Sequence, residues 1–266
     1  MPLLLASYAF VLGAVIGSFL NVVIHRYPIE ESIVSPPSRC PRCGARIRWW
    51  DNVPIISYLL LLGRCRSCRS PISLRYPFIE LANGLFYLAI FLHTGATVGF
   101  VLVAAIVSMT IVLIFIDLEI QILPDAIDLP GIAIGLLIGW LALGDRFEGL
   151  VLSPSLADSL LGAVLGSALL LGTALLYKAL RGIEGMGLGD VKMLGMIGAV
   201  AGWKPVLPLL FLASIGGAII GLLLAYRSRQ GLLFAIPFGV FLGLSTLVVI
   251  FFGHTLLAWY RSLLLV

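Results

Sequence analysis

Charged residues are scarce in this chain of 266 residues: 11% are Asp, Glu, Lys or Arg, whereas 61% are hydrophobic. A soluble globular domain has about 25% charged residues and roughly 45–50% apolar residues. The deficit excludes a soluble globular enzyme, a disordered chain and a free nucleic-acid-binding protein. The 29 glycines follow no triplet repeat, which excludes collagen, and they suit close packing of helices in lipid. The composition therefore predicts an all-α polytopic membrane protein.

Long apolar runs recur along the chain, and at about 20 residues per crossing they predict about eight transmembrane helices. The first run lacks a basic start and a small-residue cleavage pattern, so we interpret it as a retained span rather than a signal peptide. The sixth run is short for a full crossing, and we expect it to be tilted or buried among the other helices. The runs cover residues 3–23, 78–93, 100–116, 127–143, 156–177, 191–202, 206–226 and 232–252.

The basic residues concentrate in one polar segment, which divides the chain into three parts. Residues 1–24 form a first transmembrane helix, 25–77 a cysteine-rich domain, and 78–266 a multi-span membrane domain. The polar segment holds nine of the 17 Lys and Arg residues, so the net charge of +4 indicates membrane orientation rather than nucleic-acid binding. By the positive-inside rule this domain is cytoplasmic, and alternating crossings then place both termini outside.

All four cysteines lie in the polar segment, as Cys40-Pro-Arg-Cys43 and Cys65-Arg-Ser-Cys68. Two C-x-x-C turns at this spacing are typical of a zinc ribbon or knuckle, and nearby arginines favour the thiolate form that binds metal. Two disulfides are the alternative, which the reducing cytoplasm disfavours. Because four thiolates close the coordination sphere, we predict a structural zinc that stabilises a domain too small for a large core.

Acidic residues gather in two places at the edges of predicted spans, where charge is costly and usually functional. Two crossings separate Asp117 from Asp190, so both fall at the cytoplasmic boundary and can meet there. Paired carboxyls are the arrangement of an aspartic protease: one takes a proton from water and the other, protonated, polarises the scissile carbonyl. The first group is Asp117, Glu119, Asp125 and Asp128, and the second is Glu184 and Asp190.

Glycine alternates with other residues just before Asp190, at positions 185, 187 and 189. Backbone without side chains can approach a substrate strand or a facing helix closely. The alternative is a flexible loop in which Asp190 caps a helix. No strand precedes these glycines and their spacing is wrong for a dinucleotide fingerprint. Lys192 could tune the pair of carboxyls, hold a backbone carbonyl or anchor the helix at the interface.

Together these segments resemble the type IV prepilin leader peptidases, which are membrane aspartyl proteases of the GxGD type. Residues 17–28 (GSFLNVVIHRYP) are similar to the family's opening signature, and residues 36–84 to its cytoplasmic cysteine domain. IDLEIQILPD at 116–125 and EGMGLGDVKM at 184–193 are similar to its two catalytic segments. The resemblance implies that Asp117 and Asp190 are the catalytic aspartates, that Asp125 is a helix cap, and that the cysteines bind metal.

The resemblance also implies a bifunctional enzyme of the bacterial inner membrane. Similar enzymes cut a basic leader from prepilins and pseudopilins after a glycine, and many methylate the new N-terminal residue with S-adenosylmethionine. A prepilin carries its leader in the cytoplasm and its first helix in the bilayer, so its scissile bond lies at the expected depth of the two aspartates. The resemblance assigns methyl transfer to the N-terminal region, where Asn21, His25 and Glu80 are candidate contacts; helix packing is the alternative for each.

Two other functions stay open. A peptidase without methylation is one, although retention of all four cysteines favours the bifunctional enzyme. A transporter with buried acids is the other, but it would be expected to contain inverted repeats, and we see none in the sequence. Within the polar segment and the following span, Glu30, Glu31 or Glu80 could attract the basic leader. We expect Trp49 and Trp50 to pack inside the small domain.

Overall fold

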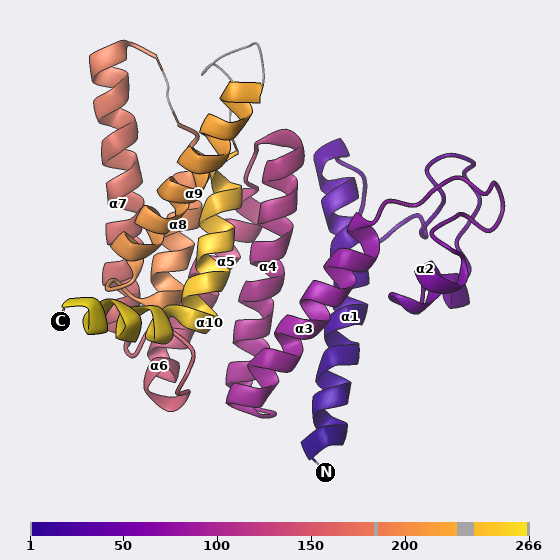
Figure 1. Ribbon diagram of the computed structural model, residues 1–266, viewed down its shortest axis with the longest axis horizontal. Coiled ribbons are helices and arrows are strands. Elements are labelled where there is room, and N and C mark those ends of the chain that lie inside the picture. The colour runs from indigo at the N-terminus through magenta and orange to yellow at the C-terminus, as the bar shows by residue number, and fades with distance from the viewer. Residues whose placement is uncertain (1, 184–185, 228–236, 265–266) are drawn as a thin grey trace. The chain divides into compact units, whose positions relative to one another are not determined.

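The computed structural model describes residues 2–183, 186–227 and 237–264, and the regular structure of these residues is helical (Figure 1). The two backbone bridges in these ranges are isolated pairs rather than strands. The all-α prediction is therefore confirmed. The long helices are α1 (Pro2–Arg26), α3 (Arg75–Thr94), α4 (Val98–Ile120), α5 (Asp125–Trp140), α7 (Leu156–Arg181), α8 (Leu188–Ala201), α9 (Val206–Arg227) and α10 (Phe238–Leu264). The short ones are η1 (Tyr27–Ile29), η2 (Trp49–Asn52), α2 (Ile56–Leu60) and α6 (Leu143–Arg146).

Each of the eight predicted spans coincides with a helix, and six helices in the described ranges are long and apolar enough to cross a membrane. The other two, α5 and α8, have 16 and 14 residues. At about 1.5 Å per residue, neither reaches the roughly 30 Å of a hydrocarbon core. The chain is thus a multi-pass membrane protein. Of the last predicted run, residues 232–236 lie outside the described residues.

The chain folds as two compact units, residues 1–112 and 113–266. In the first unit α1 packs along α3, and glycines on α1 make the close approach possible. A Cβ atom added to Gly17 would lie 2.8 Å from the Cα atom of Glu80. The amide of Asn83 donates a 2.7 Å hydrogen bond to the carbonyl oxygen of Gly13, which satisfies a buried polar group within the helix pair.

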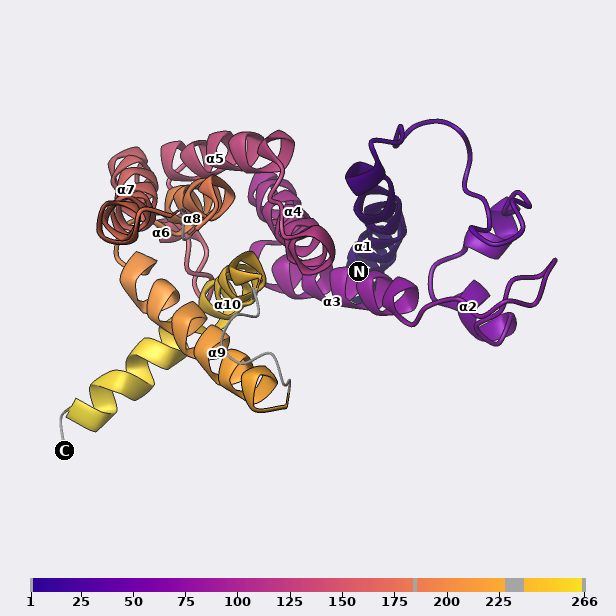
Figure 2. The same ribbon diagram turned by 90° about the horizontal axis from the view of Figure 1, so that it is seen from above.

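In the second unit α8 lies at the centre, in contact with α5, α7, α9 and α10 (Figure 2). Every residue of α8 from Met193 to Ala201 is buried. A helix that is apolar on all sides belongs in the interior. Its glycines allow close packing: Gly198 faces Gly162 of α7 so closely that a Cβ atom on either would clash with the other's backbone. The prediction that this short run is buried among the other helices is confirmed.

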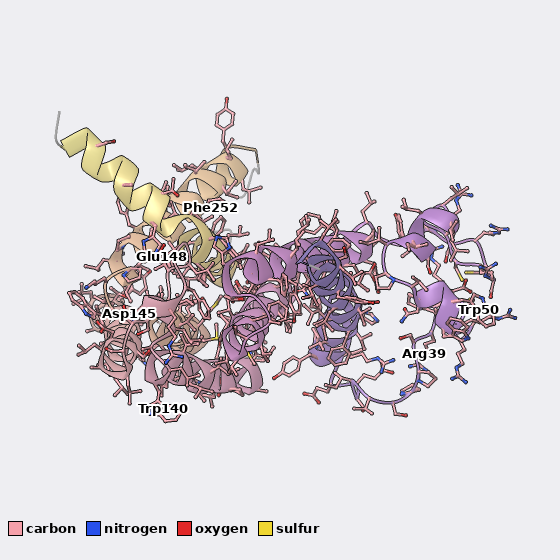
Figure 3. All side chains as sticks on the ribbon, turned by 90° about the horizontal axis from the view of Figure 1, so that it is seen from below. Arg39, Trp50, Trp140, Asp145, Glu148 and Phe252 are labelled. Carbon is pink, nitrogen blue, oxygen red and sulfur yellow. The ribbon has the colours of Figure 1, made fainter. Side chains whose placement is uncertain are left out.

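The connection from α5 to α7 is exposed at its acidic residues, Asp145 and Glu148 (Figure 3). It is held to the unit by Leu143 and Leu150, which are buried. Helix α7 then begins at a capped end, where the hydroxyl oxygen of Ser155 accepts a hydrogen bond from the backbone N–H of Asp158 at 3.1 Å. These acids have structural or surface roles, which leaves the two groups around Asp117 and Asp190 for chemistry.

Candidate active site and metal centre

The two C-x-x-C segments form two equivalent turns. In the first, the N–H of Cys40 donates to the carbonyl of Ala45, and the N–H of Gly44 donates to the carbonyl of Cys40, both at 2.9 Å. The second turn repeats this pattern 25 residues later. There the N–H of Cys65 donates to the carbonyl of Ser70 at 2.9 Å, and the N–H of Arg69 donates to the carbonyl of Cys65 at 3.0 Å. Gly44 and Arg69 both have positive φ, 70° and 58°, which closes each turn.

The two turns direct their four cysteines at one point. The Sγ atoms of Cys40, Cys43, Cys65 and Cys68 all lie within 4.8 Å of one another, and none of the four forms a disulfide. A tetrahedral zinc with Zn–S bonds of about 2.3 Å needs sulfur–sulfur separations of roughly 3.8 Å. The separation between Cys40 and Cys68 is 3.9 Å. The cluster can therefore bind a metal, as the spacing predicted.

Local hydrogen bonds favour the thiolate form at two of these positions. A hydrogen bond from the backbone N–H of Cys43 is the main reason that the pKa of Cys40 is lowered to about 6. The hydroxyl of Ser70 is the main cause that lowers the pKa of Cys68. Thiolates are the form that binds a metal ion. The sequence suggested arginine charge as the source of this effect, whereas the structure assigns it to backbone amides and a hydroxyl.

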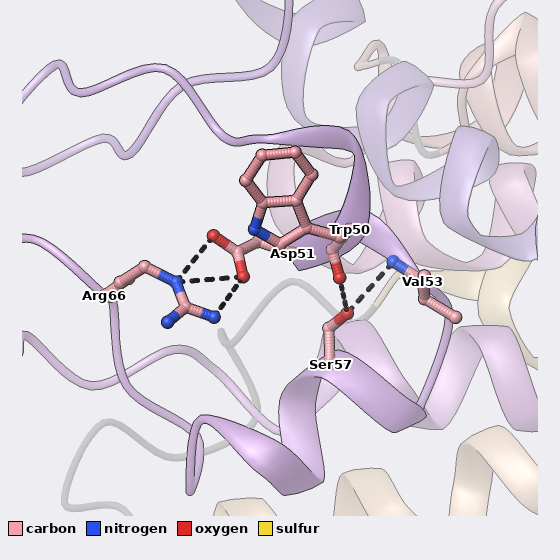
Figure 4. A network of polar contacts seen from close by, with 5 residues as sticks. All are labelled: Trp50, Asp51, Val53, Ser57 and Arg66. Atoms are coloured by element: carbon pink, nitrogen blue, oxygen red, sulfur yellow. Dashed lines mark hydrogen bonds and ion pairs between the residues drawn. The ribbon is translucent and has the colours of Figure 1, made fainter.

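A polar network joins the second turn to η2 (Figure 4). The guanidinium of Arg66 donates to both carboxylate oxygens of Asp51, with a shortest distance of 2.6 Å, and holds the pKa of Asp51 below its usual range. The hydroxyl of Ser57 donates to the carbonyl of Trp50 at 2.8 Å and accepts from the N–H of Val53 at 3.0 Å. These contacts fix the chain between the two cysteine pairs.

The tryptophans beside this network do not fill a core. Trp49 is 78% exposed and Trp50 is 46% exposed, so the prediction that they pack inside the small domain is wrong. Their rings instead contact each other edge to face at 5.3 Å, and the guanidinium of Arg48 lies over the Trp50 ring at 5.3 Å. The physical reason is the size of this segment: the metal cluster and the polar network organise it, and few apolar groups surround the rings.

Asp117 lies in the last turn of α4 and is 4% exposed. Its Oδ2 atom accepts a 3.0 Å hydrogen bond from the backbone N–H of Val240, in the first turn of α10. Free N–H groups and the positive end of the helix dipole stabilise negative charge at such a position. Gly239 makes the approach possible, because a Cβ atom there would lie 2.8 Å from Oδ2 of Asp117.

Asp190 lies in the first turn of α8, whose N-cap is Gly187, so Asp190 does not cap the helix. Asp117 and Asp190 line the same pocket, with a volume of about 390 Å³. The rest is lined by residues 121–123 after α4, by residues 186, 187 and 189 before Asp190, and by residues 237–238 at the start of α10. The structure thus brings together the two aspartates that the crossing count predicted would meet.

The alternating glycines of this pocket differ in their surroundings. Gly189 packs against the chain, since a Cβ atom there would lie 2.8 Å from Cβ of Leu123. Gly187 is exposed and has open space around it, with its nearest atom 3.9 Å away. Gly185 and Glu184 lie outside the described residues. Close approach to neighbouring chain is therefore observed at Gly189, and Gly187 leaves room at the mouth of the pocket.

Further acids of the first group lie next to the pocket. Asp125 is the first residue of α5 and follows the N-cap Pro124, so the prediction that Asp125 is the cap is wrong. Its carboxylate instead pairs with Nζ of Lys192 at 2.6 and 2.7 Å. Asp128 is 0% exposed, and its carboxyl oxygens have no hydrogen-bond partner among the described residues. Sequence reasoning noted Asp128 in the acidic group but missed its burial.

The three candidate contacts for a methyl donor differ in their burial. Asn21 is buried and donates 3.2 Å hydrogen bonds to the carbonyls of Gly17 and Tyr76. Glu80 is buried and accepts from the N–H of Ile55 at 2.7 Å, and His25 is exposed. Asn21 and Glu80 therefore contact neighbouring positions of the paired helices α1 and α3, whereas His25 is exposed.

A second cavity lies in the first unit, beside the cytoplasmic end predicted for α1. Its volume is about 340 Å³, and it is lined by α1 and by parts of residues 33–54. Most of the lining is apolar, with four polar contributors: Ser18, Arg26, Ser38 and Asn52. The guanidinium of Arg26 donates to the carbonyls of Ser32 and Pro36, both at 2.8 Å, and so forms one wall.

Comparison with known proteins gives the same picture along the chain. Residues 11–94 match the family model of the bacterial peptidase A24 N-terminal domain, and residues 104–222 match that of the type IV leader peptidase family. No solved structure matches the chain at a significant level.

Named relatives are similar over nearly their whole length. The chain is 38% identical to a prepilin leader peptidase/N-methyltransferase of Burkholderia pseudomallei, over 93% of this chain and 85% of the relative. Proteins of the same name from Pseudomonas putida and Pseudomonas aeruginosa are 36% and 35% identical, over 99% and 97% of this chain and 96% and 94% of the relatives. The matched segments include both aspartates and all four cysteines, and the chain therefore belongs to the type IV leader peptidase family.

Proposed function

We propose that this protein is a prepilin peptidase that cleaves the leader peptide with Asp117 and Asp190. The observation that carries the proposal is the shared pocket, in which two carboxyls from distant parts of the chain meet next to open space of about 390 Å³. A pair of carboxyls can activate water and polarise a carbonyl without any cofactor. The names of the relatives supply the substrate class, a type IV prepilin or pseudopilin.

The surroundings of the aspartates suggest a division of labour. Asp117 accepts the N–H of Val240 at a helix N-terminus, and this fixed donor orients the side chain so that its ionised form can take a proton from water. Asp190 then carries the proton that it donates to the scissile carbonyl oxygen as water attacks the carbonyl carbon. The resulting tetrahedral intermediate collapses, one of its hydroxyls returns a proton to Asp190, the C–N bond breaks, and the departing amine takes the proton that Asp117 had accepted from water.

Substitution of each aspartate tests this proposal. Asp117→Asn and Asp190→Asn keep the shape of the side chain but remove its charge, so each variant should lose leader cleavage while keeping its thermal unfolding temperature. The assay is the leader-sized mobility shift of a purified prepilin mixed with the enzyme in detergent. Asp125→Asn is the matched control, because Asp125 lies near the pocket but pairs with Lys192. Normal cleavage by either dyad variant would refute the assignment.

Membrane orientation is a second part of the proposal. The basic polar segment is placed in the cytoplasm, and the pocket that Asp117 and Asp190 share is placed at the cytoplasmic face of the inner membrane. The scissile bond of a prepilin lies at this boundary. Accessibility labelling of single cysteines at positions 120 and 187, in a background without the native cysteines, tests it. Labelling from opposite sides would contradict the proposal.

We further propose that the enzyme methylates the new N-terminal residue, as the names of its relatives state for them. S-adenosylmethionine supplies the methyl group. The chemistry of the cavity beside α1 suits such a ligand, because Phe19 offers an aromatic face and Ser18 and Asn52 offer hydrogen bonds. Asn21, His25 and Glu80 remain weaker candidates, because none of them lines this cavity.

Labelled S-adenosylmethionine tests the methylation proposal separately from cleavage. Asn52→Ala should weaken binding of the donor, measured by calorimetry, without changing leader cleavage. His25→Ala is the control, because His25 is exposed and lies outside the lining. If no label were transferred to a cleaved pilin, the protein would be a peptidase without methylation activity.

The metal of the four-cysteine site is proposed to be a structural zinc. The four Sγ atoms are suitably placed for tetrahedral coordination, and they leave no open position for substrate. The cysteines hold the two turns together, and the metal supplies no step of the peptide hydrolysis.

A further inference from the structure

An exposed apolar face follows η2 in the cysteine-rich segment. Ile56, Leu59, Leu60 and Leu62, here called the leucine face, are 57–84% exposed. Three of them lie on α2, at positions that share one side of a helical turn. A cluster of large exposed aliphatic side chains is costly in water and marks a contact surface.

The start of α2 is fixed to a membrane helix. The backbone N–H of Ile55 donates a 2.7 Å hydrogen bond to Oε2 of Glu80, and Glu80 is buried. Ile55 adopts a positive φ of 61°, which is unfavourable for a β-branched residue and indicates that tertiary contacts hold the chain there. The leucine face therefore has a defined position relative to α3.

That position is at the edge of the bilayer. Helix α3 has 20 residues, and at about 1.5 Å per residue its length of roughly 30 Å equals the thickness of the hydrocarbon core. Glu80 is five residues beyond the first residue of α3, or about 7.5 Å along the helix axis. Glu80 therefore lies within about 7.5 Å of the end of the span, and a backbone group bonded to it lies near the boundary of the hydrocarbon core rather than in free solution.

The charges around this face are basic. Arg39 and Arg66 of the segment pair with Glu31 and Asp51, respectively. Four other exposed arginines have no acidic partner among the described residues: Arg42, Arg46, Arg64 and Arg69. Guanidinium groups bind phosphate strongly, and unpaired basic groups next to a membrane span favour anionic lipid. A basic leader peptide would be repelled by the same charges.

We propose that α2 and the turn after it lie in the headgroup layer of the membrane, with the leucine face inserted and the unpaired arginines bound to phosphates of anionic phospholipid. This contact holds the cysteine-rich segment against the bilayer beside α1 and α3. The segment then acts as an interfacial domain rather than as a domain surrounded by water.

Photocrosslinking of the full-length protein in nanodiscs tests the proposal. Benzoylphenylalanine is placed at Leu60, on the leucine face, or at Val34, an equally apolar and 86% exposed residue of the same segment outside that face. The nanodiscs contain phosphatidylcholine alone or equal parts of phosphatidylcholine and phosphatidylglycerol. Mass spectrometry then measures lipid adducts. We expect several-fold more adduct at position 60 than at position 34, and a further increase with phosphatidylglycerol.

Charge variants separate the arginines from the apolar insertion. Arg64→Gln combined with Arg69→Gln should remove the increase with phosphatidylglycerol, whereas Arg39→Gln, which alters an arginine paired with Glu31, should keep it. Equal adduct at positions 60 and 34 would overturn the proposal. Adduct yields that do not depend on phosphatidylglycerol would also overturn it, as would crosslinking of position 60 to an added prepilin in place of lipid.

Discussion

The carboxylate of Asp117 accepts the backbone N–H of Val240 at 3.0 Å, across 123 positions of the sequence. This bond joins the end of α4 to the first turn of α10. A carboxylate stabilised by a helix N-terminus is suited to serve as a base. The relationship depends on Gly239, whose missing side chain leaves room for the carboxylate.

Gly239→Ala should therefore reduce cleavage without unfolding the protein. The added Cβ atom would lie 2.8 Å from Oδ2 of Asp117 and displace it. A displacement of about 1 Å at a catalytic group can cost roughly 100-fold in rate. We expect kcat to fall at least tenfold with little change in KM and no fall in unfolding temperature, because alanine is the better helix former. Val240→Ala keeps the N–H donor, and its kcat should be normal.

Removal of one cysteine should release the metal and destabilise the cysteine-rich segment. Cys40→Ser breaks a cluster in which all four Sγ atoms lie within 4.8 Å. Elemental analysis should show loss of the metal, and limited proteolysis should show cleavage within residues 38–72. Ser67→Ala, within the second C-x-x-C turn, is the control. Metal loss without any change in proteolysis would contradict a structural role.

The two cysteine turns should respond in opposite ways to substitutions at equivalent positions. Gly44 and Arg69 have φ values of 70° and 58°, a conformation that costs a residue with a Cβ atom roughly 1–2 kcal/mol. Gly44→Ala should weaken metal retention, and Arg69→Gly should strengthen it. Competition with a chelator measures both. If metal retention changed in the same direction in both variants, the two turns would not be equivalent.

The Asp51–Arg66 pair should stabilise the segment over the whole neutral range. Because Arg66 lowers the pKa of Asp51, this contribution is fully present above the unfolded value of about 3.9 and is lost only as the pH falls through the folded value. Arg66→Gln should lower the unfolding temperature only slightly, since Arg66 is largely exposed and its ion pair is screened by solvent. Thermal unfolding should show a constant difference between pH of about 5 and 8. A difference that disappears by pH of about 6 would argue against the pair.

Close packing of α7 and α8 predicts a strong steric effect at their glycines. Gly198→Val would place a side chain against the backbone of Gly162 and should destabilise the protein severely in detergent. Gly172→Val on α7 is the matched control, because a Cβ atom at Gly172 meets nothing within 4 Å. Unfolding temperatures compare the two, and similar values would show that the glycine contact is not required.

Much of this architecture follows from the sequence because its signals are local. Apolar runs locate the helices, and the C-x-x-C spacing locates the metal cluster. The pairing of Asp117 with Asp190 could also be anticipated, since two apolar runs lie between them, and α5 and α7, the helices that these runs form, return the chain to the same pocket although α5 is short.

Contacts made by backbone groups could not be predicted in this way. Any residue except proline could supply the N–H groups that Val240 and Ile55 donate, so the partners of Asp117 and Glu80 carry no sequence signature. The same holds for the ion pair between Asp125 and Lys192, which depends on how α5 packs against α8. Pro237 followed by Gly239 marks the start of a helix, but these residues do not reveal which carboxylate lies beside it.

The burial of α8 has a consequence for how this enzyme can be adapted to other peptides. Only the first turn of that helix reaches the pocket, and four neighbouring helices enclose the rest, with close glycine contacts from α5, α7 and α10. Asp190 is thus held in one position, and a substrate must place its scissile bond there. Changes of specificity belong in the exposed lining at 121, 122 and 187, where side chains can vary without disturbing the interior.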